Sequence, residues 1–424
     1  MKIIKTPTRS QWPKLCQRPQ IELEFLESAV KNILNRVQKS GDEALKEFTW
    51  QFDKVKLDTI QVKQTEISEA VAGLPSTLKT AILSAAKNIE TFHTSQKRDI
   101  TLVETMPGVT CWRKGTPIQK VGIYIPGGSA PLFSTVLMLG VPAQLAGCVE
   151  VVLCSPPDKN GNINPAILFA AYHTGIKKIF KVGGAQAIAA MTYGTETIPS
   201  VSKIFGPGNQ YVTKAKQLIS QEGVAIDMPA GPSEVLVIAD HAANPSYLAA
   251  DLLSQAEHGP DSQVILATTH AELIPPVLQE IEVQVERLPR KQIAREALTN
   301  SLAIVFDSTN ELVDFVNEFA PEHLIINTTD SDQLVDKIVN AGSIFLGPYT
   351  PEAAGDYASG TNHTLPTNGF AKAFGGVSLE SFMKYITIQK ITQSGLDLLG
   401  PIVEEMAEAE QLKGHAEAVR VRRK

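Results

Sequence analysis

Short apolar runs rich in β-branched residues alternate with helix-length amphipathic stretches through most of this 424-residue chain. This alternation is typical of strand–helix units in which helices cover a mainly parallel sheet. The sequence therefore predicts an α/β protein, and a chain of this length predicts two or three packed units. The predicted strands are residues 121–125, 149–154, 178–182, 203–205, 235–239, 263–268, 302–306 and 343–346.

Helix signals are clear in several places. In residues 244–256, Asn244 can act as the N-cap and Pro245 suits the first turn. Long helical patterns at residues 23–40 and 65–95 predict a helical lead-in with few strands before residue 101. From residue 381 onward helix formers return at 404–411 and 416–419, with a break expected at Gly414.

Composition excludes several classes of protein. The net charge of −6 argues against nucleic acid as a partner, and the basic end of the chain is expected to be a solvated tail. Residues 131–154, the most apolar stretch, contain Pro142, Gln144 and Glu150, so no membrane span is expected. The first residues lack the pattern of a secretory signal. Four cysteines without Cys-x-x-Cys spacing suit a reducing, cytoplasmic setting.

Four glycine-rich loops are the first candidates for ligand binding. They are residues 124–129, 182–186, 205–209 and 229–233. Glycine lets a backbone approach a ligand closely, and helix N-termini favour anions, so such loops suit a pyrophosphate-bearing cofactor. Ordinary tight turns remain the alternative, because none of the loops completes the G-x-G-x-x-G fingerprint. In a doubly wound sheet, loops of this kind are expected at the carboxyl ends of the strands.

Two polar pairs could carry chemistry. Gln255 and His258, three residues apart at a helix end, place a carbonyl oxygen and an imidazole on one face, as a metal site requires. Glu322 and His323 follow the predicted helix 310–319 and combine two groups able to transfer protons near neutral pH. Each pair also has a simpler interpretation as solvated polar residues at a helix end.

The combination of segments resembles the histidinol dehydrogenase family from about residue 25 to the end of the chain. The resemblance is carried by YIPGGSAPLFSTVLM at 124–138, VGGAQAIAA at 182–190, GPGNQY at 206–211, DMPAGPSEVLVIAD at 227–240, DLLSQAEHG at 251–259, APEHL at 320–324 and GDYASGTNHTLP at 355–366. Ser202 is a small departure, since the family often has Asp before the GPGN strand. The departure affects no catalytic assignment.

The resemblance implies an NAD-dependent oxidoreductase that acts on an alcohol. The expected reaction is the last step of histidine biosynthesis, the oxidation of L-histidinol through the aldehyde to L-histidine with two NAD⁺ used in succession. The implied metal is one zinc ion per subunit. Its role would be to hold and orient the substrate, because zinc is not redox-active. The residues matching the family's zinc ligands are Gln255, His258, Asp356 and His415.

The resemblance also implies roles for other residues. Glu322 would activate the water that hydrates the aldehyde, and His323 would transfer protons around each hydride step. The expected NAD contacts are Tyr124, Gln186 and Asn209. The positions matching substrate contacts are Ser233, Gln255, His258, His323, Asp356, Glu410 and His415. His363 is a weaker candidate on the substrate side.

The implied fold is that of aldehyde and histidinol dehydrogenases, two incomplete Rossmann-like domains with helical N- and C-terminal extensions. Residues 1–25 would form an N-terminal extension. The first domain, with the metal and catalytic residues, would comprise 26–123 and 235–380, and the second, with the NAD contacts, 124–234. The tail, 381–424, would complete the site of a second subunit, which predicts a homodimer.

Two other functions stay open. A thiol-dependent aldehyde dehydrogenase would use Cys111 or Cys154 as its nucleophile, although the sequence favours buried structural cysteines, because Cys154 ends an apolar strand and no neighbouring cation is evident that would lower its pKa. A nonenzymatic paralogue that binds NAD or a metabolite would keep the scaffold but lose polar site residues. Those residues are all present here: Glu322, His323, Gln255, His258, Asp356 and His415.

Overall fold

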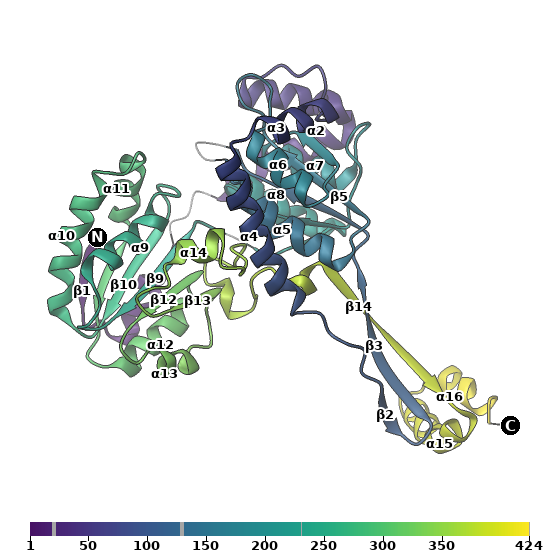
Figure 1. The fold of residues 1–424 in the computed structure, drawn as a ribbon. Helices are drawn as coiled ribbons and strands as arrows, with labels where there is room; N and C mark the ends of the chain where they lie inside the picture. Colours follow the sequence, from purple (N-terminus) through teal and green to yellow (C-terminus); the bar gives the residue numbers. More distant parts are fainter. Residues whose placement is uncertain (19–22, 128–130, 230, 424) are drawn as a thin grey trace.

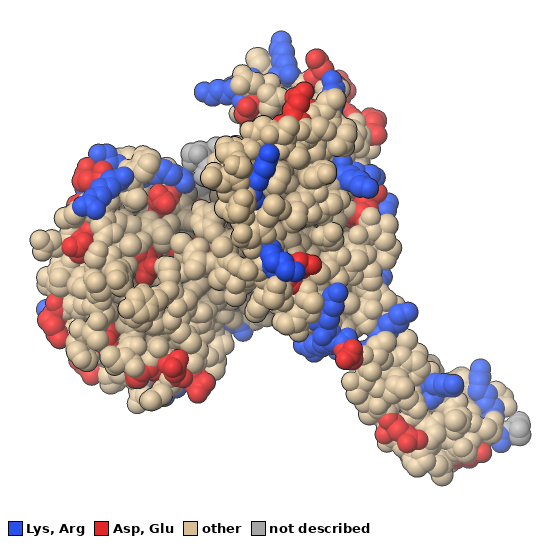
Figure 2. All heavy atoms as spheres, viewed as in Figure 1, with Lys and Arg blue, Asp and Glu red and all other residues tan. Residues whose placement is uncertain are grey.

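The computed structural model describes residues 1–18, 23–127, 131–229 and 231–423. They form two α/β lobes and a slender arm that projects away from both lobes and carries the C-terminus (Figure 1). On the face drawn in Figure 2, acidic and basic side chains are interspersed over the lobes and the arm. No helix among the described residues is long and apolar enough to cross a membrane.

The first lobe is built on a six-stranded parallel sheet in the order β1-β11-β10-β9-β12-β13. Every residue of the four central strands is buried, which explains their continuous apolar sequences. The strands are β1 (Lys2–Lys5), β9 (Glu234–Ala239), β10 (Gln263–Thr268), β11 (Leu302–Val305), β12 (His323–Asn327) and β13 (Ser343–Leu346).

Helices cover both faces of this sheet. One face packs against α9 (Pro245–Ala256), α10 (Ile274–Val285) and α11 (Lys291–Thr299). The other face packs against α1 (Trp12–Leu15), α12 (Thr309–Phe319) and α13 (Ser331–Leu334). A short helix, α14 (Glu352–Tyr357), follows β13. Asn244 caps α9 as predicted, because its side-chain oxygen accepts the Ser246 N–H at 2.9 Å.

The second lobe has a five-stranded parallel sheet in the order β6-β5-β4-β7-β8. Its strands are β4 (Lys120–Tyr124), β5 (Glu150–Ser155), β6 (Lys178–Lys181), β7 (Lys203–Phe205) and β8 (Ala225–Ile226). One face packs against α3 (Gln64–Gly73), α4 (Ser76–Thr94), α5 (Phe133–Ala146) and α6 (Pro165–His173). The other packs against α2 (Leu23–Phe48), α7 (Gly184–Tyr193) and α8 (Gln210–Ile219).

The arm is an antiparallel sheet in the order β14-β3-β2 that ends in two helices. Its elements are β2 (Val103–Met106), β3 (Val109–Pro117), β14 (Met383–Ile391), α15 (Gln393–Ala409) and α16 (Lys413–Arg420). Short helical turns occupy Arg9–Gln11, Thr49–Asp53, Ser220–Glu222, Ala271–Leu273, Val335–Lys337, Phe370–Lys372 and Leu379–Phe382.

The packing differs from the expected domain division in two places. Residues 26–123 were expected in the first domain, but β4 belongs to the second sheet and the apolar faces of α2, α3 and α4 pack on it. Residues 1–25 were expected as an extension, but β1 is an edge strand of the first sheet, paired with β11. Residues 235–380 hold the rest of that sheet, with β9 beginning one residue earlier.

The tail also differs from its expected structure. Residues from 381 onward were expected to be helical, but β14 occupies the first part and pairs with β3 along its whole length. Gly414 lies inside α16 and does not break it. The helices separate at residues 410–412 instead, where Gln411 adopts a left-handed backbone with φ of 62°.

Candidate active site

A cleft of about 600 Å³ is lined by residues of both lobes. It brings together the predicted site residues Tyr124, Asn209, Ser233, His258, Glu322 and His363. These residues come from segments far apart in the sequence, so their meeting in one cleft supports a shared role. The residues that line this cleft do not include Gln186, Gln255, His323 and Asp356.

The two sheets face the cleft with opposite ends. Tyr124 is the last residue of β4, and the glycines at 184 and 206 follow β6 and β7, so the second lobe presents carboxyl ends of strands, as predicted. In the first lobe, Ser233 precedes β9 and His323 begins β12. The catalytic candidates therefore lie at the amino ends of the strands in their sheet. Ligand sites of doubly wound sheets usually lie at the carboxyl ends instead, so that pattern would not have placed them here.

The expected NAD contacts are arranged by the loops after β4, β6 and β7. The Tyr124 hydroxyl accepts the Gly184 N–H at 3.0 Å at the start of α7. Asn209 caps α8 by accepting the N–H groups of Tyr211 and Val212 at 3.1 and 3.2 Å. Gln186 is buried in the first turn of α7, and its Oε1 has no hydrogen-bond partner among the described residues. Ser129 and Ala230, in two of the predicted loops, lie outside the described residues.

Glu322 and His323 are buried side by side where β12 begins. Glu322 Oε2 accepts the backbone N–H of Glu234 at 2.8 Å and lies 3.5 Å from His323 Nδ1. Burial raises the pKa of the Glu322 carboxyl. Burial alone would lower the pKa of His323, but the Glu322 and Asp356 carboxylates raise it well above its usual value. The pair is therefore a buried acid–base couple.

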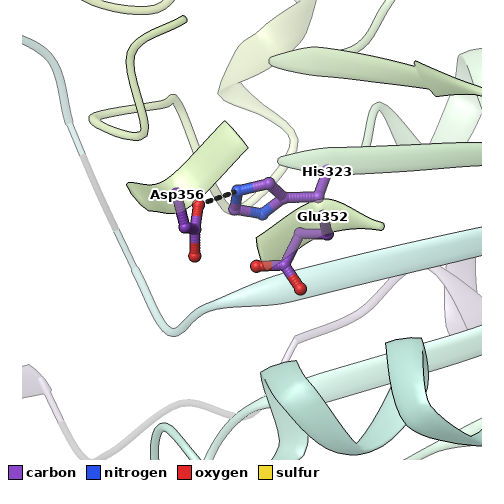
Figure 3. A group of neighbouring side chains, drawn as sticks. All are labelled: His323, Glu352 and Asp356. Carbon is purple, nitrogen blue, oxygen red and sulfur yellow. Dashed lines mark ion pairs between the residues drawn. The ribbon is translucent and has the colours of Figure 1, made fainter. Parts of the chain in front are cut away.

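His323, Glu352 and Asp356 converge from β12 and α14 (Figure 3). His323 Nε2 lies 3.3 Å from Asp356 Oδ1. His323 holds the pKa of the Asp356 carboxyl below its usual range, although burial opposes this shift. Burial and the nearby Asp356 raise the pKa of Glu352. The cluster combines imidazole and carboxylate groups, which are ligands that divalent metals accept.

Gln255 joins this cluster from α9. Its Nε2 donates to Glu352 Oε1 at 2.7 Å and lies 3.2 Å from His323 Nδ1. With the amide nitrogen held by Glu352, Gln255 Oε1 is a buried acceptor without a partner among the described residues, while Asp356 Oδ1 faces His323 Nε2 at 3.3 Å. A buried amide oxygen without a donor next to a carboxylate fits a cation, because leaving a buried acceptor unpaired costs free energy. His258, one turn beyond Gln255, is exposed to the cleft.

The chain does not bring every expected ligand to this place. Glu410 is the C-cap of α15 and His415 lies in α16, and both side chains are exposed on the arm. Figure 1 shows these helices at the far end of the arm, away from α9, α14 and β12. Within one chain, the arm therefore cannot supply His415 to the residues around Gln255.

Three polar residues of this region were not predicted. Glu352 holds the Gln255 amide, and Arg18 forms an ion pair with Glu234 beneath the Glu322–His323 segment. The spacing of Glu352 and Asp356, four residues apart on one helix face, was a signal for the first. Arg18 and Glu234 are 216 residues apart, and no local pattern connects them.

Comparison with known proteins identifies the family. The histidinol dehydrogenase family model matches residues 16–423. The histidinol dehydrogenase of Bacteroides fragilis (strain YCH46) is 58% identical over 422 residues, which cover 100% of this chain and 99% of the relative. The chain belongs to the histidinol dehydrogenase family. The relative from Escherichia coli (strain K12) is 51% identical over 418 residues, covering 98% of this chain and 95% of the relative.

A solved structure of the family has the same fold. The crystal structure of histidinol dehydrogenase from Elizabethkingia anophelis matches with a TM-score of 0.97 and 56% identity, covering 100% of this chain and 98% of that one. The predicted α/β fold class and the predicted family are thereby confirmed. So is the predicted enzyme class, an NAD-dependent oxidoreductase acting on an alcohol, at the level of histidinol dehydrogenase.

Proposed function

We propose that the protein oxidises L-histidinol through L-histidinaldehyde to L-histidine in two successive NAD-linked steps, with one zinc ion per subunit. The observation that carries the proposal is the convergence of Gln255 Oε1, a buried oxygen without a hydrogen-bond partner among the described residues, and the Asp356 carboxylate beside the Glu322–His323 couple. The zinc ligands would be Gln255, His258, Asp356 and the His415 of a second copy. When bound, zinc supplies a Lewis acid that holds the substrate's nitrogen atoms.

Residues of the chain itself transfer the protons and contact the substrate. His323 takes the proton of the alcohol and returns protons between the steps, because neighbouring carboxylates favour its charged form. Glu322 takes a proton from the water that hydrates the aldehyde. Its raised pKa makes it a stronger base than an exposed glutamate, and the Glu234 N–H orients it. Ser233, on the cleft wall, and the Glu410 of a second copy contact the substrate.

The second lobe binds the nicotinamide cofactor, which supplies the hydride acceptor. Tyr124 and Asn209 line its part of the cleft, and Gln186 lies in the first turn of α7, where its free oxygen can accept a hydrogen bond. Retaining the aldehyde between the two steps keeps a reactive amino aldehyde from reacting with amines or escaping before the second oxidation.

The position of the arm supports a homodimer. Glu410 and His415 can reach a metal and substrate site only in another copy, since their own lies far away (Figure 1). We place the enzyme in the cytoplasm, as a biosynthetic enzyme with four free cysteines, acting on a small molecule and neither on nucleic acid nor at a membrane.

A thiol mechanism is less well supported. Cys154 is buried at the end of β5, and burial raises its pKa, so the reactive thiolate is disfavoured. Cys111 lies in β3 of the arm, away from the cleft. No cysteine is among the described residues that line the cleft. A nonenzymatic paralogue is disfavoured by the intact acid–base couple.

The test is turnover by the purified protein. With L-histidinol and NAD⁺, we expect L-histidine to form together with two equivalents of NADH, and metal analysis to find about one zinc per subunit. A variant in which all four cysteines are Ala should keep this activity. Binding of NAD⁺ and histidinol without turnover would instead support the nonenzymatic paralogue, and loss of activity in the cysteine-free variant would support the thiol enzyme.

A further inference from the structure

Arg18, in the segment before α2, is a buried charge directly behind the acid–base couple. Its side chain is 5% exposed and that of its partner Glu234 is fully buried. The guanidinium contacts both carboxylate oxygens of Glu234, with Nε to Oε1 at 3.1 Å and Nη2 to Oε2 at 2.9 Å. The Asn368 N–H also donates to Oε1, at 2.6 Å. The Glu234 side chain is therefore held from several directions.

The backbone of Glu234 in turn contacts the catalytic candidates. Its N–H donates to Glu322 Oε2 at 2.8 Å, and its carbonyl oxygen lies 3.2 Å from His323 Nδ1. Glu234 is the first residue of β9 and pairs with Gln263 of β10, whereas the pairing of β9 with β12 begins only at Val235. The anchored side chain thus fixes the direction in which this N–H points.

Arg18 also contacts the end of α12, the segment that leads into Glu322. Its Nη2 donates to the carbonyl oxygen of Phe319 at 2.7 Å, and the guanidinium lies over the Phe319 ring, 3.6 Å from the centroid. Phe319 ends α12, and the chain then turns through Ala320, with φ of 53°, into Glu322. One side chain therefore joins the two segments whose relative position sets the distance between the Glu234 N–H and the Glu322 carboxylate.

We propose that Arg18 is a positioning residue for Glu322, acting through Glu234 and Phe319. The inference rests on the proposed function, in which Glu322 serves the aldehyde hydration that precedes the second oxidation. Loss of Arg18 should therefore slow that second oxidation more than the first. A lysine cannot replace the arginine fully, since a point charge lacks the planar fork that contacts two oxygens at once.

The experiment measures the two oxidations separately. Because removing Arg18 alone would leave Glu234 as a buried, unpaired charge, the main variant is the double substitution R18M/E234Q, with R18K as the second variant. The first oxidation is followed with histidinol and an aldehyde trap, and the second with supplied histidinaldehyde. We expect the second kcat to fall about a hundredfold in R18M/E234Q and less in R18K, with the first kcat changed by about threefold or less.

The matched control removes another ion pair of low exposure, Lys181 with Glu66 in the second lobe, through K181M/E66Q. It should lower stability without changing the ratio of the two rates. A wild-type ratio in both Arg18 variants, or an equal fall of both rates as expected for general destabilisation, would overturn the inference. E322Q measured in parallel distinguishes failure of the proposed role of Glu322 from failure of the proposed role of Arg18. If E322Q itself spares the second oxidation, the proposed role of Glu322 fails first.

Discussion

Burial at the start of β12 gives Glu322 a basicity that the sequence alone does not reveal. The carboxyl is removed from water, which raises its pKa, while one backbone N–H from Glu234 fixes its direction. His323 beside it is held among carboxylates that favour its protonated form. The surroundings thus raise the pKa of both residues, which makes each a stronger base than its exposed counterpart and suits the pair to proton transfer.

Replacing Glu322 with Gln keeps the size of the side chain and removes the base. We expect formation of histidine to fall roughly 10²–10⁴-fold, because general-base catalysis of this kind contributes such factors. The first NADH should still form, so histidinaldehyde should accumulate in an aldehyde trap. Product analysis by chromatography checks this, and a histidine-to-NADH ratio equal to that of the wild type would contradict it.

Glu352 orients the proposed zinc ligand Gln255, because its carboxylate holds the amide nitrogen of Gln255 and leaves Oε1 free. The substitution E352L should release the amide and weaken zinc binding about 10–100-fold, as losses of such supporting contacts do. E352Q, which keeps an acceptor oxygen, is the matched control and should lose less. Zinc retained after dialysis against a chelator is the readout. Equal retention by E352L and the wild type would refute this role.

At the scale of elements, the site is the meeting of two sheets that present opposite ends to one cleft. The second lobe uses the loops that follow its strands, and their glycines let the chain turn close to neighbouring backbone. The first lobe uses the residues that precede β9 and begin β12, whose parallel register pairs His323 with Val235. The strands therefore place Ser233 and the Glu322–His323 couple side by side.

Gly206 is the loop glycine whose geometry is most restrictive. Its φ is 123°, and a Cβ there would collide with the carbonyl oxygen of Tyr124. The substitution G206A should destabilise this loop by roughly 1–3 kcal/mol and raise the KM for NAD⁺ more than that for histidinol. G375A is the control, since a Cβ added at Gly375 would have no atom of the described residues within 4 Å. Steady-state kinetics with each substrate varied in turn gives the two KM values. Equal KM values for NAD⁺ in both variants would contradict the prediction.

The sequence predicted the buried elements better than the exposed or functional ones. Short apolar runs mark these strands in the sequence, so β7, β10 and β13 begin and end at the predicted residues, although β13 lies at the edge of its sheet. β12 was missed because its first residue, His323, follows a helix end and resembles a polar loop. β14 was missed because its two faces are largely exposed and its composition is mixed.

The site itself could be predicted only in part. Local spacing suggested Gln255 with His258 and Glu322 with His323, while the remaining residues depended on family resemblance. The Arg18–Glu234 contact depends on tertiary packing between distant segments, which no local pattern encodes. The same holds for residues 26–123, whose packing on the second sheet follows from which apolar faces meet.

At the scale of the whole molecule, the arm carries the features on which the proposed homodimer rests. α15 exposes Leu398, Ile402 and Met406, four residues apart along one helical face, each at least half exposed. Exposed apolar stripes of this kind suit contact with another protein surface. The same helices carry Glu410 and His415, so a second copy that covers the stripe would also receive these side chains.

The central claim is that each catalytic centre is assembled from two chains. The most direct test mixes E322Q and H415A, two variants that we expect to form little histidine, under conditions that exchange subunits, and follows the formation of histidine. In a mixed dimer, one centre combines an intact Glu322 with an intact His415 from the other chain, so random exchange should restore about a quarter of the wild-type activity. If exchange is verified and no activity returns, the centre is built within one chain and the account is wrong.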